Sequence, residues 1–353
     1  MPLHAVEIVG YLPDYRFKEP YYSSVLPEQL PLLDEVRYFG MTIAADGSLN
    51  VTASHEANLT KLARTIQSQP GIAQPRVVLT LGGGGGNMSD NFAIVAGNSA
   101  KRKVFAANIR DFIESHDLAG VNLDWEAPST ESERANYVSL LKDIKHAVGS
   151  KLVTIAIAPS LLLPNQVVSG DDGIDGVDLM TYGLGWWGND PRLPTVGEHS
   201  PQSFVEEAVN AWTQPLGTRQ PRTWVFGSKT SVELPPDKLG VGLPFYGLGY
   251  DGTDRGSART YANLLNNGTT SDGQRFELGG EHYWIPSLDD VRQRVAYADE
   301  QGIARIIVWE ISQDVPPSDS RSMLRATAVP EPTTTTLLAT GMLFIIASRR
   351  RRP

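Results

Sequence analysis

The feature that most constrains this chain is an alternation of strand-like and helix-like segments between residues 6 and 315. Short apolar runs bounded by glycine, proline or polar residues alternate with longer stretches whose apolar residues recur every three to four positions. This alternation is typical of a parallel sheet whose strands are connected by helices. Eight strands close a barrel, so the sequence predicts a (β/α)8 (TIM) barrel over residues 1–317. The expected strands are residues 6–12, 36–43, 77–81, 120–125, 152–158, 176–182, 239–244 and 303–310.

The connecting helices carry recognisable start and stop signals. Thr130 and Glu133 have the spacing of a capping box, in which each side chain satisfies a backbone amide of the first turn. Ser287 is the expected N-cap of a later helix, and Gly302 is expected to close that helix. The four helices predicted with most detail are residues 100–116, 130–148, 203–212 and 288–301.

Two regions depart from the alternating pattern. Residues 246–286 are polar and rich in glycine and asparagine, and they contain too few apolar residues for a core of their own. We therefore expect a short irregular insertion between strands 7 and 8 of the barrel. Residues 318–332 are rich in proline, serine and threonine and are expected to form a flexible linker, followed by a separate segment at residues 333–353.

The composition excludes several classes of function. The net charge of -9 argues against nucleic acid as a partner, because an acidic surface repels phosphate. Cysteine is absent, and the histidines show no metal-ligand spacing, so no metal is expected. The glycine run 82–86 lacks the Lys-Ser/Thr of a phosphate loop. We therefore expect no cofactor.

The most informative segment is the expected fourth strand, Leu118-Ala-Gly-Val-Asn-Leu-Asp-Trp-Glu126. Side chains alternate between the two faces of a strand, so Asn122, Asp124 and Glu126 share one face and the other face is apolar. In a β/α barrel the apolar face packs against helices, and the inward face near the strand's carboxyl end lines the active site. The segment thus predicts an inward polar ladder that ends at the catalytic rim.

Two neighbouring carboxyl groups in a low dielectric cannot both ionise cheaply, so at least one pKa is expected to rise. A carboxyl group that stays neutral near pH 7 is what a general acid for glycosidic cleavage requires. The structural alternative is a buried polar ladder that only satisfies hydrogen bonds inside the barrel. Burying three polar residues in a small barrel is costly, which favours the functional interpretation.

The segment Ala119-Gly-Val-Asn-Leu-Asp-Trp-Glu126 resembles the DxxDxDxE signature of glycoside hydrolase family 18, which contains chitinases and endo-β-N-acetylglucosaminidases. Asp124 and Glu126 are kept, whereas Ala119 and Asn122 replace the first two aspartates. Six further segments resemble motifs of this family, in the same order. They are Gly10-Tyr-Leu-Pro-Asp-Tyr15, Leu79-Thr-Leu-Gly-Gly83, Ala156-Ile-Ala-Pro159, Leu179-Met-Thr-Tyr182, Gly242-Leu-Pro-Phe-Tyr-Gly247 and Val308-Trp309-Glu310.

The resemblance implies a retaining hydrolase that cleaves β-1,4 bonds next to N-acetylglucosamine, in chitin, chitooligosaccharides or N-glycan cores. The substrate's own 2-acetamido oxygen would attack the anomeric carbon. Glu126 would act as acid and then base, Asp124 would accept the acetamido N–H, and Tyr182 would donate to the acetamido oxygen. The expected amide donor to Asp124 is Asn122. The expected sugar-binding residues are Tyr11, Met180, Trp309, Trp187 and Tyr246.

Alternatives remain open at this point. Trp187 could stack on a sugar or pack inside its loop, because buried tryptophan is common. Gly183 replaces the aspartate of the family's sixth-strand motif, which weakens the case for chitin-type substrates. The alternative function is a non-hydrolytic, lectin-like glycan-binding protein on the same barrel, although such relatives typically lose the acid that Glu126 represents here.

The C-terminal segment has a pattern of its own. Val329-Pro-Glu-Pro332 is followed by threonines, an apolar run at 337–347 and a cluster of arginines at 349–352. This order resembles the PEP-CTERM sorting signal of some Gram-negative bacteria, which implies export and handling by a sorting machinery at the membrane. A frayed tail is the simpler alternative, since the apolar run is shorter than the roughly 20 residues of a spanning helix. No N-terminal signal peptide is visible, and the expected location is the cell surface or the exterior.

Overall fold

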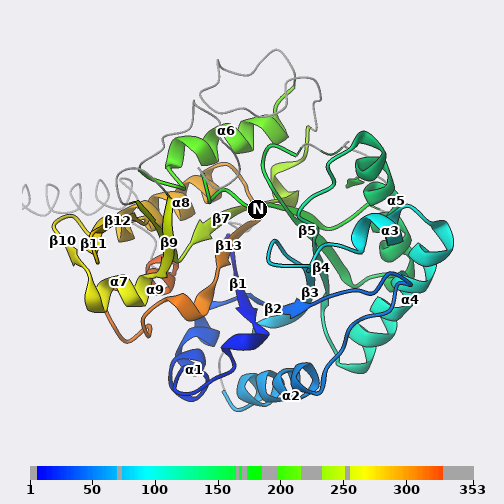
Figure 1. Cartoon of the computed structure of the whole chain (residues 1–353), viewed down its shortest axis with the longest axis horizontal. Coiled ribbons are helices and arrows are strands. Elements are labelled where there is room, and N and C mark those ends of the chain that lie inside the picture. The colour runs from blue at the N-terminus through cyan, green and yellow to red at the C-terminus, as the bar shows by residue number, and fades with distance from the viewer. Residues whose placement is uncertain are drawn as a thin grey trace, which may run out of the picture.

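The computed structural model describes residues 6–69, 74–161, 163, 167–168, 173–184, 197–215, 233–250 and 255–328. At its centre is a closed barrel of eight strands in the order β1-β13-β7-β6-β5-β4-β3-β2 (Figure 1). All eight neighbouring pairs are parallel, which confirms the predicted (β/α)8 barrel. The strands are β1 (Glu7–Pro13), β2 (Glu35–Met41), β3 (Arg76–Gly82), β4 (Gly120–Asp124), β5 (Leu152–Ile157), β6 (Gly176–Leu179), β7 (Leu239–Pro244) and β13 (Arg305–Trp309).

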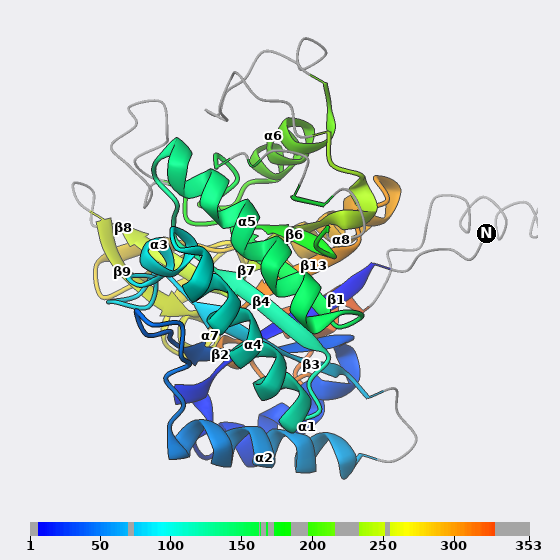
Figure 2. The ribbon, with the colours of Figure 1, turned by 90° about the vertical axis from the view of Figure 1, so that its right-hand side faces the viewer.

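Helices surround the barrel, as two perpendicular views show (Figures 1 and 2). Both predicted caps are present: Thr130 Oγ1 accepts the amide of Glu133 at 3.1 Å, and Ser287 Oγ accepts that of Asp290 at 3.2 Å. Each cap stabilises its helix by about 1 kcal/mol. The helices are α1 (Leu26–Gln29), α2 (Ala53–Gln67), α3 (Phe92–Ala96), α4 (Ser99–Ser115), α5 (Glu131–Val148), α6 (Gln202–Thr213) and α8 (Leu288–Glu300).

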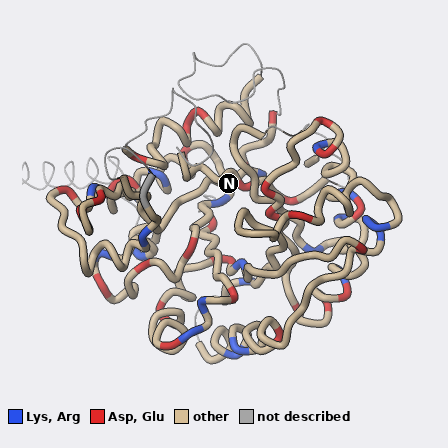
Figure 3. Tube along the Cα trace, viewed as in Figure 1, with Lys and Arg blue, Asp and Glu red and all other residues tan. Residues whose placement is uncertain are grey.

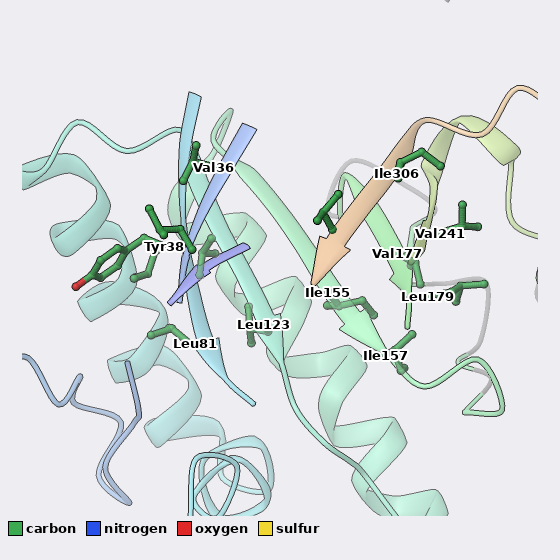
Figure 4. Close-up of a cluster of buried hydrophobic side chains, with 14 of the residues drawn as sticks. Val36, Tyr38, Leu81, Leu123, Ile155, Ile157, Val177, Leu179, Val241 and Ile306 are labelled. Carbon is green, nitrogen blue, oxygen red and sulfur yellow. The ribbon is translucent and has the colours of Figure 1, made fainter. Parts of the chain in front are cut away.

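The hydrophobic core lies between the strands and the helices. Figure 4 shows side chains from several barrel strands, among them Leu123 of β4, gathered in one buried cluster. Trp125, directly after β4, stacks on Phe92 of α3 with ring centroids 5.7 Å apart and meets Tyr137 of α5 edge-on at 5.0 Å. These aromatic contacts fix the outer face of the segment that carries the polar ladder, so the ladder must point inward.

The insertion between β7 and β13 is regular, so the prediction of an irregular segment was wrong. It forms a five-stranded antiparallel sheet in the order β10-β11-β12-β8-β9, together with helix α7. Phe276 and Tyr283 are paired across two strands and buried in the main core, so the insertion does not need a core of its own. Its elements are β8 (Tyr246–Tyr250), β9 (Arg255–Thr260), α7 (Tyr261–Asn267), β10 (Thr269–Thr270), β11 (Arg275–Leu278) and β12 (Glu281–Trp284).

Residues 318–328, expected to belong to a flexible linker, are part of the folded body. They contain helix α9 (Met323–Thr327), in which Met323 and Leu324 are fully buried. The carboxylate of Asp314 accepts the backbone amides of both residues, at 3.1 and 2.8 Å. Polar composition was misleading here because a buried aspartate supplies acceptors for the start of the helix.

The surface carries both signs of charge. Figure 3 shows acidic and basic residues interspersed around the ring of helices. Within the described part of the chain, no helix is both long and apolar enough to cross a membrane. The predicted C-terminal segment, residues 333–353, lies outside the described residues.

Candidate active site

The polar ladder of β4 points into the barrel as predicted, but Asn122 has different partners from those expected. Its Oδ1 accepts a hydrogen bond from the Tyr11 hydroxyl of β1 at 3.0 Å. Its Nδ2 donates to Thr154 Oγ1 of β5 at 2.9 Å. The amide was expected to donate to Asp124, and this prediction was wrong because Thr154, on the neighbouring strand, offers a well-placed acceptor.

Asp124 is a buried carboxyl group with one unpaired oxygen. Its side chain is only 3% accessible to solvent, and among the described residues its Oδ1 has no hydrogen-bond partner. Burial and the charge of Glu126 raise the pKa of Asp124 well above its usual range, while the charge of Arg37 acts in the opposite direction. An unsatisfied buried acceptor is costly, and this oxygen can accept a hydrogen bond from a bound molecule.

Glu126 lies two residues beyond β4, at the carboxyl end of the barrel, and is partly exposed. Its backbone N–H donates to Ser89 Oγ at 3.1 Å, and its carboxylate accepts the backbone N–H of Gly84. Burial raises the pKa of Glu126 to about 7, although the Gly84 hydrogen bond opposes this rise. Because each carboxylate disfavours the ionisation of the other, the pair with Asp124 holds a proton near neutral pH. The predicted rise of at least one pKa is confirmed.

The glycine run after β3 forms the backbone cradle of this pair. The N–H of Gly83 donates to the carbonyl oxygen of Asp124 at 2.7 Å. A Cβ atom added at Gly84 would lie 2.6 Å from Glu126 Oε2, so only glycine lets the loop approach the carboxyl group this closely. Ser89 Oγ donates to the carbonyl oxygen of Gly83 at 2.9 Å and thereby ties the loop together. The sequence indicated a tight backbone approach at the glycine run but gave no signal for Ser89.

A hydrophobic wall stands beside the carboxyl pair, and three of the predicted sugar-binding or catalytic residues belong to it. Met180, Tyr182 and Tyr246 are buried in one cluster, against which the half-buried Trp309 packs. The rings of Tyr182 and Tyr246 meet edge-on with centroids 6.3 Å apart. Gly242 of β7 makes room for this wall, since a Cβ atom there would lie 2.6 Å from the Tyr182 ring.

His199 was missed by the sequence analysis and joins two parts of this wall. Its Nδ1 accepts the backbone N–H of Gly183 at 3.2 Å, and its Nε2 is 3.0 Å from the carbonyl oxygen of Tyr246. Burial lowers the pKa of His199 to about 4, so the ring is neutral with its proton on Nε2. Gly183 has φ +76°, a conformation that glycine adopts without strain. A lone histidine in a polar loop carries no sequence signal for this role.

Tyr11 and Trp309 lie together beneath the wall. Their ring centroids are 5.4 Å apart, and Trp309 also meets Phe39 edge-on at 4.9 Å. Tyr11 is 1% accessible, and its hydroxyl is used by Asn122 and by Arg37, whose Nη1 donates at 2.9 Å. Tyr11 therefore has no free polar atom for a sugar and supports the floor of the site.

Trp187 lies outside the described residues. Among the residues whose structure is described, no three histidine, aspartate or glutamate side chains converge as metal ligands. The arrangement brings together one partly exposed carboxyl group with a raised pKa, one buried carboxyl group with a free acceptor, and an aromatic wall. Such a site can donate a proton and stabilise a nearby positive charge.

Comparison with known proteins identifies two regions of the sequence. Residues 7–314 match glycosyl hydrolases family 18, and residues 328–352 match the PEP-CTERM protein-sorting motif. A class V chitinase of Arabidopsis thaliana is 25% identical over 333 residues, covering 82% of each chain. A probable endochitinase of Caenorhabditis elegans is 27% identical over 270 residues, which cover 63% of this chain but only 41% of the worm protein.

Solved structures share the fold. The GH18 chitinase from Cycas revoluta in complex with (GlcNAc)3 has a TM-score of 0.70 at 17% identity, covering 92% of this chain and 99% of that one. The chitinase-like agglutinin from Robinia pseudoacacia has a TM-score of 0.67 at 19% identity, covering 91% and 98%. The family match over residues 7–314, with an inward carboxyl pair at the end of β4, shows that this chain belongs to glycosyl hydrolases family 18.

Proposed function

We propose that this protein is a retaining glycoside hydrolase that cleaves β-1,4 bonds next to N-acetylglucosamine, with chitin or chitooligosaccharides as the preferred substrate class. The observation that carries the proposal is the carboxyl pair: Glu126 is partly exposed with a pKa of about 7, and Asp124 is buried with a free acceptor oxygen. The names of the relatives support the substrate class, since they include chitinases and a chitinase complex with (GlcNAc)3.

The reaction would proceed in two steps. In the first, Glu126 donates its proton to the glycosidic oxygen, and the substrate's 2-acetamido oxygen attacks the anomeric carbon as the leaving group departs. Asp124 accepts the acetamido N–H and stabilises the oxazolinium ion electrostatically. In the second step, Glu126 takes a proton from water, which opens the oxazolinium ion with net retention. The N–H donor keeps Asp124 anionic, so the shared proton stays on Glu126 when substrate is bound.

The aromatic wall would position the sugar. Tyr182 donates its hydroxyl to the acetamido oxygen and Met180 packs against the pocket, while Trp309 lies beneath the sugar ring. Tyr246 lines the same wall, and burial raises its pKa, so its hydroxyl stays a neutral donor. Amphipathic rings suit sugars because their faces bind C–H groups and their polar atoms bind hydroxyls.

The proposal is tested by mass spectrometry of products from a panel of chitooligosaccharides, high-mannose glycans and peptidoglycan fragments. We expect wild-type protein to shorten chitooligosaccharides. Glu126→Gln should bind them with similar affinity without turnover. Glu131→Gln, an exposed change at the start of α5, serves as the control and should match wild type. Binding without turnover by the wild type on every substrate would support the lectin-like alternative, for which the Robinia agglutinin provides a precedent in fold.

We further propose that the C-terminal motif directs export, followed by cleavage and transfer at the inner membrane. The match of residues 328–352 to a protein-sorting motif supports this. Fractionation of a Gram-negative host that has the sorting machinery would test it. We expect the full chain to be cleaved near residue 329 and to be found at the surface or in the medium. A chain that lacks residues 329–353 should not be processed in this way. An unprocessed full chain in such a host would contradict the proposal.

A further inference from the structure

A cluster of buried charges fills the barrel below the carboxyl pair, and Arg37 of β2 is at its centre. The Arg37 side chain is inaccessible to solvent. Its Nε donates to Glu35 Oε1 at 2.7 Å, and its Nη1 lies 2.7 Å from Asp178 Oδ2 and 2.9 Å from the Tyr11 hydroxyl. Arg305 of β13 pairs with the other oxygen of Asp178 at 2.9 Å. Two half-buried residues, Arg76 and Glu7, extend this cluster through Glu35. The full set has three cations and three anions: Arg37, Arg76, Arg305, Glu7, Glu35 and Asp178.

Arg37 determines the direction of the hydrogen bonds that run beneath Asp124. A guanidinium group can only donate, so the Tyr11 oxygen must accept from Arg37 and give its own proton elsewhere. That proton goes to Asn122 Oδ1. The Asn122 NH2 group is thereby turned to the opposite side, where it donates to Thr154. Asp124 receives no hydrogen bond from Asn122 and keeps its free oxygen for substrate.

Arg37 also supplies the positive charge that acts on Asp124. Its field lowers the pKa of Asp124, against the effects of burial and of Glu126. The other ionisable groups that interact with Asp124 are the hydroxyls of Tyr11 on β1, Tyr137 on α5 and Tyr182 after β6, all of which burial keeps neutral. Among the described residues, Arg37 is thus the one cation with a resolved effect on this carboxyl group.

We propose that Arg37 is a positioning residue for hydrolysis: acting through Tyr11, it orients the Asn122 amide away from Asp124, and its charge favours the anionic form of Asp124. This inference rests on the proposed hydrolytic function. The proposal explains why position 122 can be an asparagine, because the buried Arg37 influences the charge of Asp124. An ionisable side chain at 122 is then not needed.

Arg305 provides a matched control. Arg37→Met and Arg305→Met each remove one cation from the same buried cluster and each leave Asp178 short of a partner, but only Arg37 contacts Tyr11. We expect Arg37→Met to lower kcat about tenfold or more with KM changed less than about twofold. Arg37→Lys, which keeps the charge, should recover most of this loss, and Arg305→Met should keep kcat within about threefold of wild type. Equal losses in the two methionine variants would overturn the proposal.

A second measurement does not depend on turnover. The carboxyl carbon of Asp124 can be followed by 13C NMR across pH, with Asp124→Asn to assign the signal. Arg37→Met should raise the apparent midpoint by about one pH unit, and Arg305→Met should leave it nearly unchanged. If wild type lacks turnover while the midpoint moves as expected, the hydrolase function fails and the electrostatic role of Arg37 stands.

If Arg37→Met does not fold, Arg37→Lys and Tyr11→Phe replace it. Tyr11→Phe removes the hydroxyl that connects Arg37 to Asn122 and keeps all the ion pairs. Unchanged kcat in Tyr11→Phe would overturn the proposal.

Discussion

The backbone N–H of Gly84 donates to the carboxylate of Glu126, and a Cβ atom at Gly84 would lie 2.6 Å from Oε2 of that carboxylate. The glycine loop after β3 therefore lies against the carboxyl group of Glu126, the proposed proton donor, which follows the neighbouring strand β4. Any side chain at position 84 would therefore have to displace the carboxyl group of Glu126, the acid of the proposed reaction.

Gly84→Ala tests this contact. The added methyl group must push the Glu126 carboxyl group out of place, so we expect kcat to fall about tenfold or more while the fold is retained. Gly85→Ala is the matched control, because a Cβ atom there meets nothing within 4 Å. Steady-state kinetics on a chitooligosaccharide and thermal unfolding of both variants provide the comparison. Equal activity of the two variants would mean that the loop does not position Glu126.

The pH dependence of the rate follows from the ionisation of Glu126. The general acid must be protonated to work, and its pKa is raised to about 7. We therefore expect kcat/KM to fall tenfold per pH unit above a midpoint near 7. Neutral chitooligosaccharides have no group that titrates in this range, so the midpoint reports on the free enzyme. A plateau that extends to pH 9 would exclude Glu126 as the acid.

Glu126→Gln should also change stability in a pH-dependent way. The folded-state pKa of Glu126 is raised from 4.5 to about 7, so ionisation favours the unfolded state and its penalty grows as pH rises through this window. Replacement by neutral glutamine removes at most about 3 kcal/mol of that penalty. We expect the variant to be more stable than wild type at pH 8 and nearly equal at pH 4. A stability difference that does not vary with pH would argue against a raised pKa.

Two truncations test the role of helix α9. Removing residues 329–353 should leave the melting temperature unchanged, because helix α9 and its hydrogen bonds to Asp314 are kept. Removing residues 318–353 also deletes Met323 and Leu324, both fully buried, and should cost about 3 kcal/mol or more. Thermal unfolding of the two proteins compares them directly, and equal melting temperatures would restore the linker interpretation of residues 318–328.

The sequence was sufficient for the barrel and for the carboxyl pair because both depend on local periodicity. The two-residue alternation through Asn122, Asp124 and Glu126 sets which face is inward, and the apolar residues between them leave no other arrangement. The sheet of the insertion was not predicted, because its strands are short and its apolar side chains pack into the main core. The buried pair Phe276 and Tyr283 is an example.

The supporting contacts of the site were beyond sequence reasoning. Arg37 meets Asp178 across 141 positions, and no local pattern connects the two strands that carry them. Ser89 and His199 each act through hydrogen bonds to backbone atoms of the site, which depend on how the loops fold rather than on a residue pattern. These hydrogen-bond and ion-pair partners come together only when the barrel closes.

The most direct test of the central claim is the anomeric configuration of the first product released from a chitooligosaccharide, followed by 1H NMR before mutarotation at a pH below 7. Attack by the substrate's acetamido oxygen, with Glu126 as acid and then base, predicts the β-anomer. Initial release of the α-anomer would exclude attack by the acetamido oxygen with Glu126 as acid and then base.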